Sequence, residues 1–388
     1  MHRPSPAFTG LHRMVARLST GRIGSGRSEG DIVASSQRNG RISARTGRSA
    51  FGVLLAATLA FGAAVPAGAH SSRPWRKPHH IDHVFVIVLE NYKTEDVTPA
   101  TMPYLFGLTQ TGATLDEMYG VDHFSLSNYI AMTSGNAPTP GTKADCFQYD
   151  CIFEAPADRN IGDQLEESGR TWKAYMESMP APCSHPTVSG SLDPYLVGYA
   201  TRHNPFMYYR DIVGPDISVT TPRCVDHDVP LTQLSTDLAN RDLPNYALIV
   251  PNTCNDAHDR GDNCALPTAD AWLAANVPPI LATKDFAKHG ALIITFDESE
   301  GGDTRGCCGN SAGGKIFTSV ISRAVANPGT HTATPYNHYS VLRTIEDAFG
   351  LDCLGLACDA GAQPFGTDVW LVRNHKHRHH HGDHHDDD

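Results

Sequence analysis

Beyond residue 69 the sequence has few basic residues and no long apolar run. The 388-residue chain has a formal net charge of -11, and its first 69 residues contribute nine Arg against Glu29 and Asp31. Without them the charge is -18, from 22 basic and 40 acidic residues. A protein this acidic binds the nucleic-acid backbone poorly, and we therefore expect no nucleic-acid partner. A phosphorylated small-molecule or lipid substrate could still bind through a cation. No stable membrane span is expected, and the oligomeric state is open.

The N-terminal segment has the layout of a secretory signal. Residues 1–47 contain no Lys, are rich in Arg, Ser and Gly, and show no apolar periodicity, which predicts disorder. Arg48, the apolar stretch 50–65 and the sequence AGA at 67–69 then form a basic region, a hydrophobic region and a cleavage site. A membrane anchor is the alternative, for which this stretch is short. We expect cleavage after Ala69 and a secreted protein, extracellular or at the cell surface.

The cysteines include no C-x-x-C pair, which argues against a zinc site. All ten Cys follow residue 69, as expected for disulfides in an oxidising compartment. Three close pairs look local and a fourth could close a longer loop: Cys146 with Cys151, Cys254 with Cys264, Cys353 with Cys358, and Cys183 with Cys224. The adjacent Cys307 and Cys308 have no evident partner.

From residue 81 onward, strand-like and helix-like segments alternate. Strands are expected at 83–89, 171–176, 245–250, 291–296 and 316–321. Helices are expected at 102–112, 126–134, 160–168, 231–240, 269–288 and 336–348. This alternation predicts an α/β fold, a three-layer α/β/α sandwich with a largely parallel central sheet.

The expected fold occupies one domain, residues 70–373. Within it the Pro- and Cys-rich segment 180–229 is irregular and is interpreted as an insertion or cap. The tail 374–388 is rich in His and Asp and is expected to be disordered. It could sequester transition metals, be merely solvated, or be an addition made for expression.

Polar side chains follow two of the expected strands directly. The run 84–89 does not alternate, so it reads as a strand buried on both faces, and Glu90 and Asn91 come next. Asp297 and Glu298 follow the strand 291–296 in the same way. Ligands of open α/β sheets collect at the carboxyl ends of the strands, so these oxygen donors suggest a metal site. The alternative is that they are solvated loop residues.

A serine stands where another helix is expected to begin. Ser125 precedes the helix-like run that ends near Gly135. Unpaired N–H groups and the helix dipole favour an alkoxide or a phosphoryl oxygen there, although an ordinary N-cap serine is the simpler explanation.

Seven motifs resemble, in order, those of the phosphoesterase family of bacterial phospholipases C and acid phosphatases, within the alkaline-phosphatase-like superfamily. They are ENY at 90–92, DHFSLSNYIAMTSG at 122–135, ESMP at 177–180, RHNPF at 202–206, PNTCNDAHD at 251–259, ITFDESEGGD at 294–303 and NHYSVLRTIEDAFG at 337–350. In its short length the chain resembles the secreted bacterial acid phosphatases.

The resemblance implies roles for single residues. Ser125 would be the nucleophile, and Asn128 would bind a phosphoryl oxygen, with His123 beside them as a substrate contact. The implied metal ligands are Glu90, Asn91, Asp297, Glu298 and the Ser125 oxygen. The implied opposite wall consists of Asp256, His258 and His338, and His203 would contact phosphate or assist the leaving group. The family usually reads H-P-S-x-P-N, and here Phe124 and Ser127 replace both prolines, which makes Ser127 a rival hydroxyl.

We therefore expect a secreted phosphoric ester hydrolase that forms a phosphoserine. One oxygen-ligated divalent ion (Mg, Mn or Ca) would activate the serine and neutralise phosphate. A phosphomonoesterase of the acid phosphatase type is the first choice. Imidazole side chains have an ordinary pKa of about 6.5, which points weakly to an acid pH optimum. A phospholipase C is the second, if the aromatic-rich segment 195–209 exposes an apolar rim. A non-catalytic metal- or phosphate-binding surface protein is the alternative from another class.

Overall fold

The structure is a computed structural model that describes residues 80–146, 149–185, 198–259, 263–309, 311–359 and 361–371. The expected leader, the cleavage site after Ala69 and the His/Asp-rich tail lie outside these residues. None of the helices described is long and apolar enough to cross a membrane.

An eight-stranded sheet forms the centre of the domain, in the order β10-β2-β9-β7-β1-β6-β4-β5. The strands are β1 (His83–Leu89), β2 (Ala113–Leu115), β4 (Trp172–Met176), β5 (Asp228–Pro230), β6 (Tyr246–Val250), β7 (Gly290–Phe296), β9 (Thr318–Ser322) and β10 (Thr330–Thr332). Strand β9 runs antiparallel to both of its neighbours, and the other pairs are parallel. The central strands β1, β6 and β7 are buried almost throughout, which explains why their sequences do not alternate.

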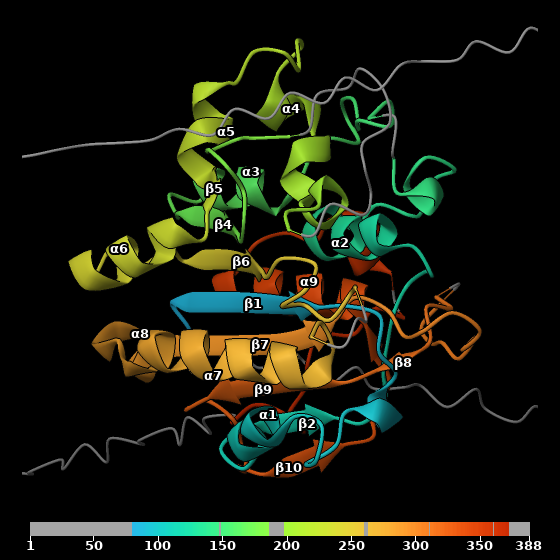
Figure 1. Cartoon of the computed structure of the whole chain (residues 1–388), viewed down its shortest axis with the longest axis vertical. Coiled ribbons are helices and arrows are strands. Elements are labelled where there is room, and N and C mark those ends of the chain that lie inside the picture. Colours follow the sequence, from blue (N-terminus) through green and yellow to red (C-terminus); the bar gives the residue numbers. More distant parts are fainter. Residues whose placement is uncertain are drawn as a thin grey trace, which may run out of the picture. The chain divides into compact units, whose positions relative to one another are not determined.

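Helices cover both faces of the sheet, so the predicted three-layer α/β class is confirmed. Figure 1 shows α7 (Leu266–Ala282) and α8 (Lys284–His289) in front of β7, with α9 (His338–Phe349) behind β1. Helix α1 (Pro103–Thr109) packs on α7, and α2 (Ser125–Ser134) packs on α9. Helices α3 (Ile161–Glu167) and α6 (Thr232–Asn240) both contact β4.

Three predicted elements are divided in the structure or lose residues to a neighbouring strand. The segment 316–321 divides at Phe317 into β8 (Lys315–Ile316) and β9, and β8 belongs to a small sheet with β3 (Met118–Tyr119) and β11 (Tyr336–Asn337). The predicted helix 336–348 therefore begins only at His338. The predicted helix 269–288 is two helices, because Thr283 has an extended backbone shortly after Pro278 and Pro279, whose missing N–H groups weaken the end of α7.

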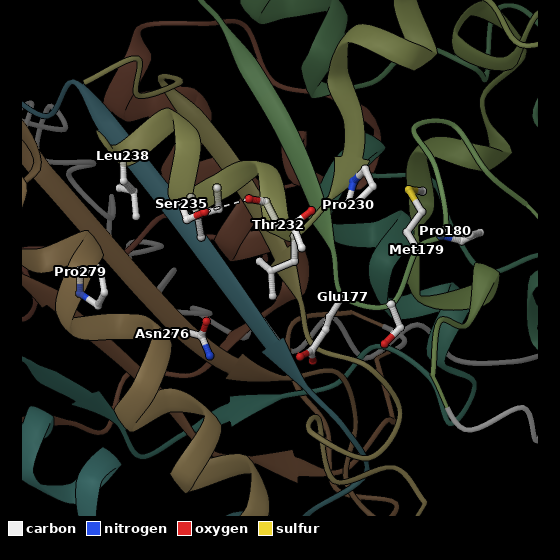
Figure 2. Close-up of a pocket in the computed structure, with 12 residues that line it drawn as sticks. Glu177, Met179, Pro180, Pro230, Thr232, Ser235, Leu238, Asn276 and Pro279 are labelled. Carbon is white, nitrogen blue, oxygen red and sulfur yellow. Dashed lines mark hydrogen bonds between the residues drawn. The ribbon is translucent and has the colours of Figure 1, made fainter. Parts of the chain in front are cut away.

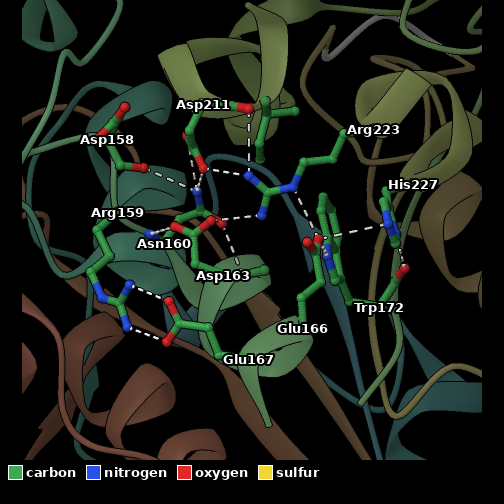
Figure 3. A network of polar contacts seen from close by, with 12 residues as sticks. Asp158, Arg159, Asn160, Asp163, Glu166, Glu167, Trp172, Asp211, Arg223 and His227 are labelled. Carbon is green, nitrogen blue, oxygen red and sulfur yellow. Dashed lines mark hydrogen bonds and ion pairs between the residues drawn. The ribbon is translucent and has the colours of Figure 1, made fainter. Parts of the chain in front are cut away.

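The described part of segment 180–229 is tied to the domain by ion pairs. It contains the short helices α4 (Arg210–Val213) and α5 (Pro222–His227) and the edge strand β5. Arg223 of α5 reaches Asp163 at 2.6 Å, Asp211 at 2.5 Å and Glu166 at 3.0 Å, which joins α5 to α3 and α4 (Figure 3). His203 lies in the same segment, in the 3-10 turn Thr201–His203.

All four predicted disulfides are confirmed: Cys146–Cys151, Cys183–Cys224, Cys254–Cys264 and Cys353–Cys358. The fifth joins the adjacent Cys307 and Cys308, a pairing that the sequence analysis left open.

Candidate active site

Two carboxylates meet at the carboxyl ends of β1 and β7. These strands are parallel neighbours in the register Leu89 with Phe296, so the residues that follow them, Glu90 and Asp297, emerge at the same edge of the sheet. Both side chains are fully buried. Asn91 adopts a left-handed backbone with φ 57°, and its N–H donates to Asp297 Oδ1 at 3.0 Å. The two strand ends are thereby locked together.

Ser125 lies against this carboxylate pair. It is the first residue of α2, and its hydroxyl donates to Glu90 Oε2 at 2.9 Å. The rival Ser127 instead donates its hydroxyl to Thr142 Oγ1 at 3.0 Å. Of the two hydroxyls, the structure brings Ser125 to the predicted metal ligands.

Two further predicted residues on this side, Asn128 and His123, contact protein groups. The Asn128 amide donates to the carbonyls of Asp122 and Phe124 at 2.9 and 3.1 Å, and its oxygen accepts the Val121 N–H at 2.7 Å. It therefore shapes the loop in front of Ser125. His123 Nδ1 lies 3.1 Å from Glu298 Oε2, and its Nε2 donates to the Asp303 carbonyl at 2.7 Å.

The three predicted residues of the opposite wall and His203 also converge. His203 Nε2 lies 3.5 Å from Glu90 Oε1, and its Nδ1 lies 3.3 Å from Asp256 Oδ2. Asp256 Oδ1 accepts the His258 N–H at 2.7 Å. His338 Nε2 donates to the Asp297 carbonyl, and its Nδ1 has no hydrogen-bond partner among the residues described. Apart from Asn128, which bonds to the loop at 121–124, the predicted site residues are thus connected to one of the two strand ends or to a neighbour of them.

Glu177 holds the loop that carries Asp256 and His258 through hydrogen bonds. This carboxylate follows β4 and accepts the Asn252 N–H at 2.8 Å and the Asn255 amide at 3.0 Å. Glu177 also lines a cavity of about 650 Å³ between α6 and α7 (Figure 2). The sequence analysis gave Glu177 no role, although its place after a buried strand is the same signal that identified Glu90.

Two more residues of the site were missed. Tyr129 donates to Glu90 Oε1 at 2.6 Å and stacks on His203 with ring centroids 5.5 Å apart. It follows Ser125 by one helical turn, so the spacing could have placed it on the same face. Arg202 is buried and directs Nη2 at His258 Nε2, 3.0 Å away. No pattern in the sequence distinguishes a buried arginine from the far commoner exposed ones.

The donor set fits a divalent cation. Glu90, Asp256, Asp297 and Glu298 are all buried in one region. Burial raises the pKa of each carboxyl, to about 6 for Asp297 and about 8 for Glu298, and the charge of Asp297 raises that of Glu90 further. Asp297 Oδ2 has no hydrogen-bond partner within the described part of the chain. Clustered carboxylates of this kind are stabilised in their charged forms by a bound cation.

The ligand atoms of Glu90, His203 and His258 also lie within 4.8 Å of one another, a second arrangement that could hold a metal. Glu90 belongs to both arrangements. Its Oε2 faces Ser125, and its Oε1 lies on the side of His203.

The strand ends of this α/β sheet thus present buried carboxylates to a serine at the start of a helix, and these residues form the candidate active site. A model of the Phosphoesterase family matches residues 74–352, and the chain belongs to this family. This confirms the resemblance drawn from the motifs.

Three proteins are similar to this chain over about three quarters of its length. An acid phosphatase of Aspergillus fumigatus is 29% identical over 307 residues, 77% of this chain and 62% of the fungal protein. A phosphatidylinositol-3-phosphatase of Mycobacterium tuberculosis is 28% identical and covers 74% of this chain and 82% of its own length. A solved Vibrio parahaemolyticus protein of the alkaline phosphatase superfamily has 13% identity and a TM-score of 0.49, over 74% of this chain and 71% of the other. The chain thus spans about three fifths of the fungal relative.

Proposed function

We propose that the protein is a secreted phosphoric ester hydrolase that cleaves phosphomonoesters through a phosphoserine at Ser125. The observation that carries the proposal is the 2.9 Å hydrogen bond from the Ser125 hydroxyl to Glu90 at the start of α2. Family membership and the acid phosphatases among the relatives support the same reaction class.

The proposed reaction has two displacements at phosphorus. The Ser125 oxygen forms a bond to phosphorus, the bond to the ester oxygen breaks, and that oxygen takes up a proton as the alcohol leaves. Water then cleaves the phosphoserine and releases phosphate. A divalent ion held by Glu90, Asn91, Asp297 and Glu298 would lower the pKa of the serine hydroxyl and neutralise substrate charge. Its proposed identity is Mg, Mn or Ca, because the ligands are oxygens.

Histidines are the groups proposed to hold the leaving-group proton. Burial lowers the pKa of His203 well below its usual value and that of His338 to about 4. The hydrogen bond with Glu298 raises the pKa of His123 to about 9. The lowered pKa values of His203 and His338 do not support the predicted acid pH optimum, because burial disfavours the protonated form of both rings.

In the described residues 198–209, the aromatic side chains do not form the exposed apolar rim that the phospholipase C alternative needs. In the described residues of segment 195–209 the aromatic side chains of Phe206, Tyr208 and Tyr209 are buried. Tyr199 is half-buried, and its hydroxyl accepts a hydrogen bond from the Asn204 amide at 3.0 Å. A lipid headgroup phosphate remains a monoester substrate to test, because one relative bears the name phosphatidylinositol-3-phosphatase.

Hydrolysis of a chromogenic phosphomonoester, a phosphatidylinositol phosphate and a phosphatidylcholine analogue tests the proposal. The exported protein is assayed across pH, with and without chelator, beside Ser125→Ala. Chelator-sensitive monoester turnover that disappears in Ser125→Ala supports it, and a preference for phosphatidylcholine moves the assignment to phospholipase C. No turnover with any divalent ion, together with phosphate binding, favours the non-catalytic binding protein. N-terminal sequencing of the exported chain tests cleavage after Ala69.

A further inference from the structure

Arg202 is a buried cation in the wall of the site. Among the residues described, it is the only Lys or Arg with less than a tenth of its surface exposed, at 7%. It precedes His203, whose ring lies between Glu90 and Asp256. A guanidinium stays charged at any physiological pH, so Arg202 brings a fixed positive charge to this wall of the site.

The guanidinium uses an atom that a metal would need. Arg202 Nη2 lies 3.0 Å from His258 Nε2, and since arginine can only donate, the lone pair of Nε2 accepts. His258 Nδ1 lies 3.2 Å from Asp259 Oδ1, which fits the tautomer with its proton on Nδ1. The grouping of Glu90, His203 and His258 can hold an ion only through that same lone pair or through a reoriented ring. In this arrangement the arginine excludes the second ion.

The charge of Arg202 also reaches the start of α2. Burial raises the pKa of the Asp145 carboxyl, and the positive charge of Arg202 opposes this shift. Asp145 Oδ1 accepts the N–H of Leu126 at 3.2 Å, directly beside Ser125. Arg202 is therefore within electrostatic range of both the wall and the helix start, the two sides between which the phosphoryl group would sit.

We propose that Arg202 is a substrate-binding residue whose guanidinium donates to phosphoryl oxygens and takes the place of a second metal ion beside Glu90, His203 and His258. The inference rests on the proposed function. An arginine forms paired, charge-assisted hydrogen bonds with phosphate, and in a site with four buried carboxylates it supplies positive charge that one divalent ion leaves unmatched.

Phosphate affinity and metal content test this role. Inorganic phosphate is titrated calorimetrically into the metal-loaded full chain carrying Ser125→Ala, with and without Arg202→Met. We expect Arg202→Met to weaken phosphate binding about 10- to 100-fold, Arg202→Lys to weaken it less, and the control Arg210→Met, whose arginine pairs with Glu154, to leave it unchanged. We expect one tightly bound divalent ion per chain with Arg202 present and a second in Arg202→Met at raised metal concentration.

A role limited to orienting His258 predicts different results. In a His258→Ala background, Arg202→Met should still weaken phosphate binding, whereas a purely orienting arginine would add nothing. Added guanidinium should restore phosphate binding to Arg202→Ala, and circular dichroism melts verify that each variant is folded. Unchanged phosphate affinity in folded Arg202→Met, or two tightly bound ions with Arg202 intact, overturns the inference. An unmutated chain that neither turns over phosphomonoesters nor binds phosphate overturns the proposed function instead.

Discussion

The Ser125 hydroxyl donates to Glu90 Oε2, and this contact joins the first residue of α2 to the end of β1 across 35 positions of sequence. The same carboxylate accepts the Tyr129 hydroxyl through its other oxygen. Glu90 thus contacts both the proposed nucleophile and His203 on the opposite side.

Replacing the nucleophile should abolish turnover, while replacing its rival should not. We expect Ser125→Ala to lower kcat by at least about 10³-fold, because the covalent step loses its attacking oxygen. Ser127→Ala removes a buried hydrogen bond to Thr142 and should cost about 1 kcal/mol of stability with kcat nearly unchanged. Steady-state kinetics and denaturant unfolding distinguish the two. Full activity in Ser125→Ala would transfer the nucleophile elsewhere.

Tyr129 should act by positioning Glu90. Tyr129→Phe keeps the ring stacked on His203 but removes the 2.6 Å hydrogen bond to Glu90. We expect metal affinity, measured by calorimetry, to fall about 10-fold, as is typical when a hydrogen bond to a metal ligand is lost. Tyr209→Phe is the matched control, since its hydroxyl contacts Thr133, one turn further along α2, and makes no contact with Glu90 among the hydrogen bonds of the described residues. Equal metal affinities in both variants would remove this role from Tyr129.

Removing the metal should destabilise the domain. The buried carboxylates Glu90, Asp297 and Glu298 repel one another without a cation. An ion that binds only the folded state raises Tm by mass action. We expect chelator to lower Tm and excess divalent ion to restore it, with Asp297→Asn abolishing most of the difference. A melting curve that does not respond to chelator in the unmutated chain would contradict the metal site.

A buried carboxyl distant from the site should make stability fall as pH rises. Glu346 in α9 is fully buried, and burial raises its pKa from 4.5 to about 8, while Oε1 accepts the Leu354 N–H. Because the folded state holds this proton more tightly than the unfolded chain, the protonated carboxyl is stabilised below pH 4.5. That stabilisation is lost as pH rises to about 8. Relative to Glu346→Gln, the unmutated protein should lose about 3 °C or more in Tm between pH 5 and pH 9. Parallel Tm curves would contradict the shift.

The strand ends could be predicted because burial on both faces leaves an unmistakable apolar run. Such runs placed Glu90 and Asp297 after β1 and β7, and the family motifs supplied Ser125 and the histidines. The two-residue strands β3 and β11 could not be found, because so few residues carry no periodicity. The prediction of a single strand at 316–321 was wrong for the same reason. A single residue, Phe317, separates β8 from β9, and these two strands belong to different sheets.

The contacts between distant loops were also beyond the sequence. Arg202 and Asp145 are ordinary surface residue types, and only the folded chain shows that Arg202 is buried and Asp145 half-buried beside the site. Asn128 was assigned to phosphate through the resemblance, and the structure has its amide bonded to the loop at 122–124. Its contact with phosphate stays a prediction.

Trapping the covalent intermediate tests the central claim most directly. The exported protein is mixed with a phosphomonoester, quenched in acid within the first turnovers and digested for mass spectrometry, with Ser125→Ala and Ser127→Ala beside it. The account predicts one phosphoryl group on Ser125, present in Ser127→Ala and absent from Ser125→Ala. A phosphoryl group on another residue, or rapid turnover with no phosphorylated peptide at any quench time, would contradict it.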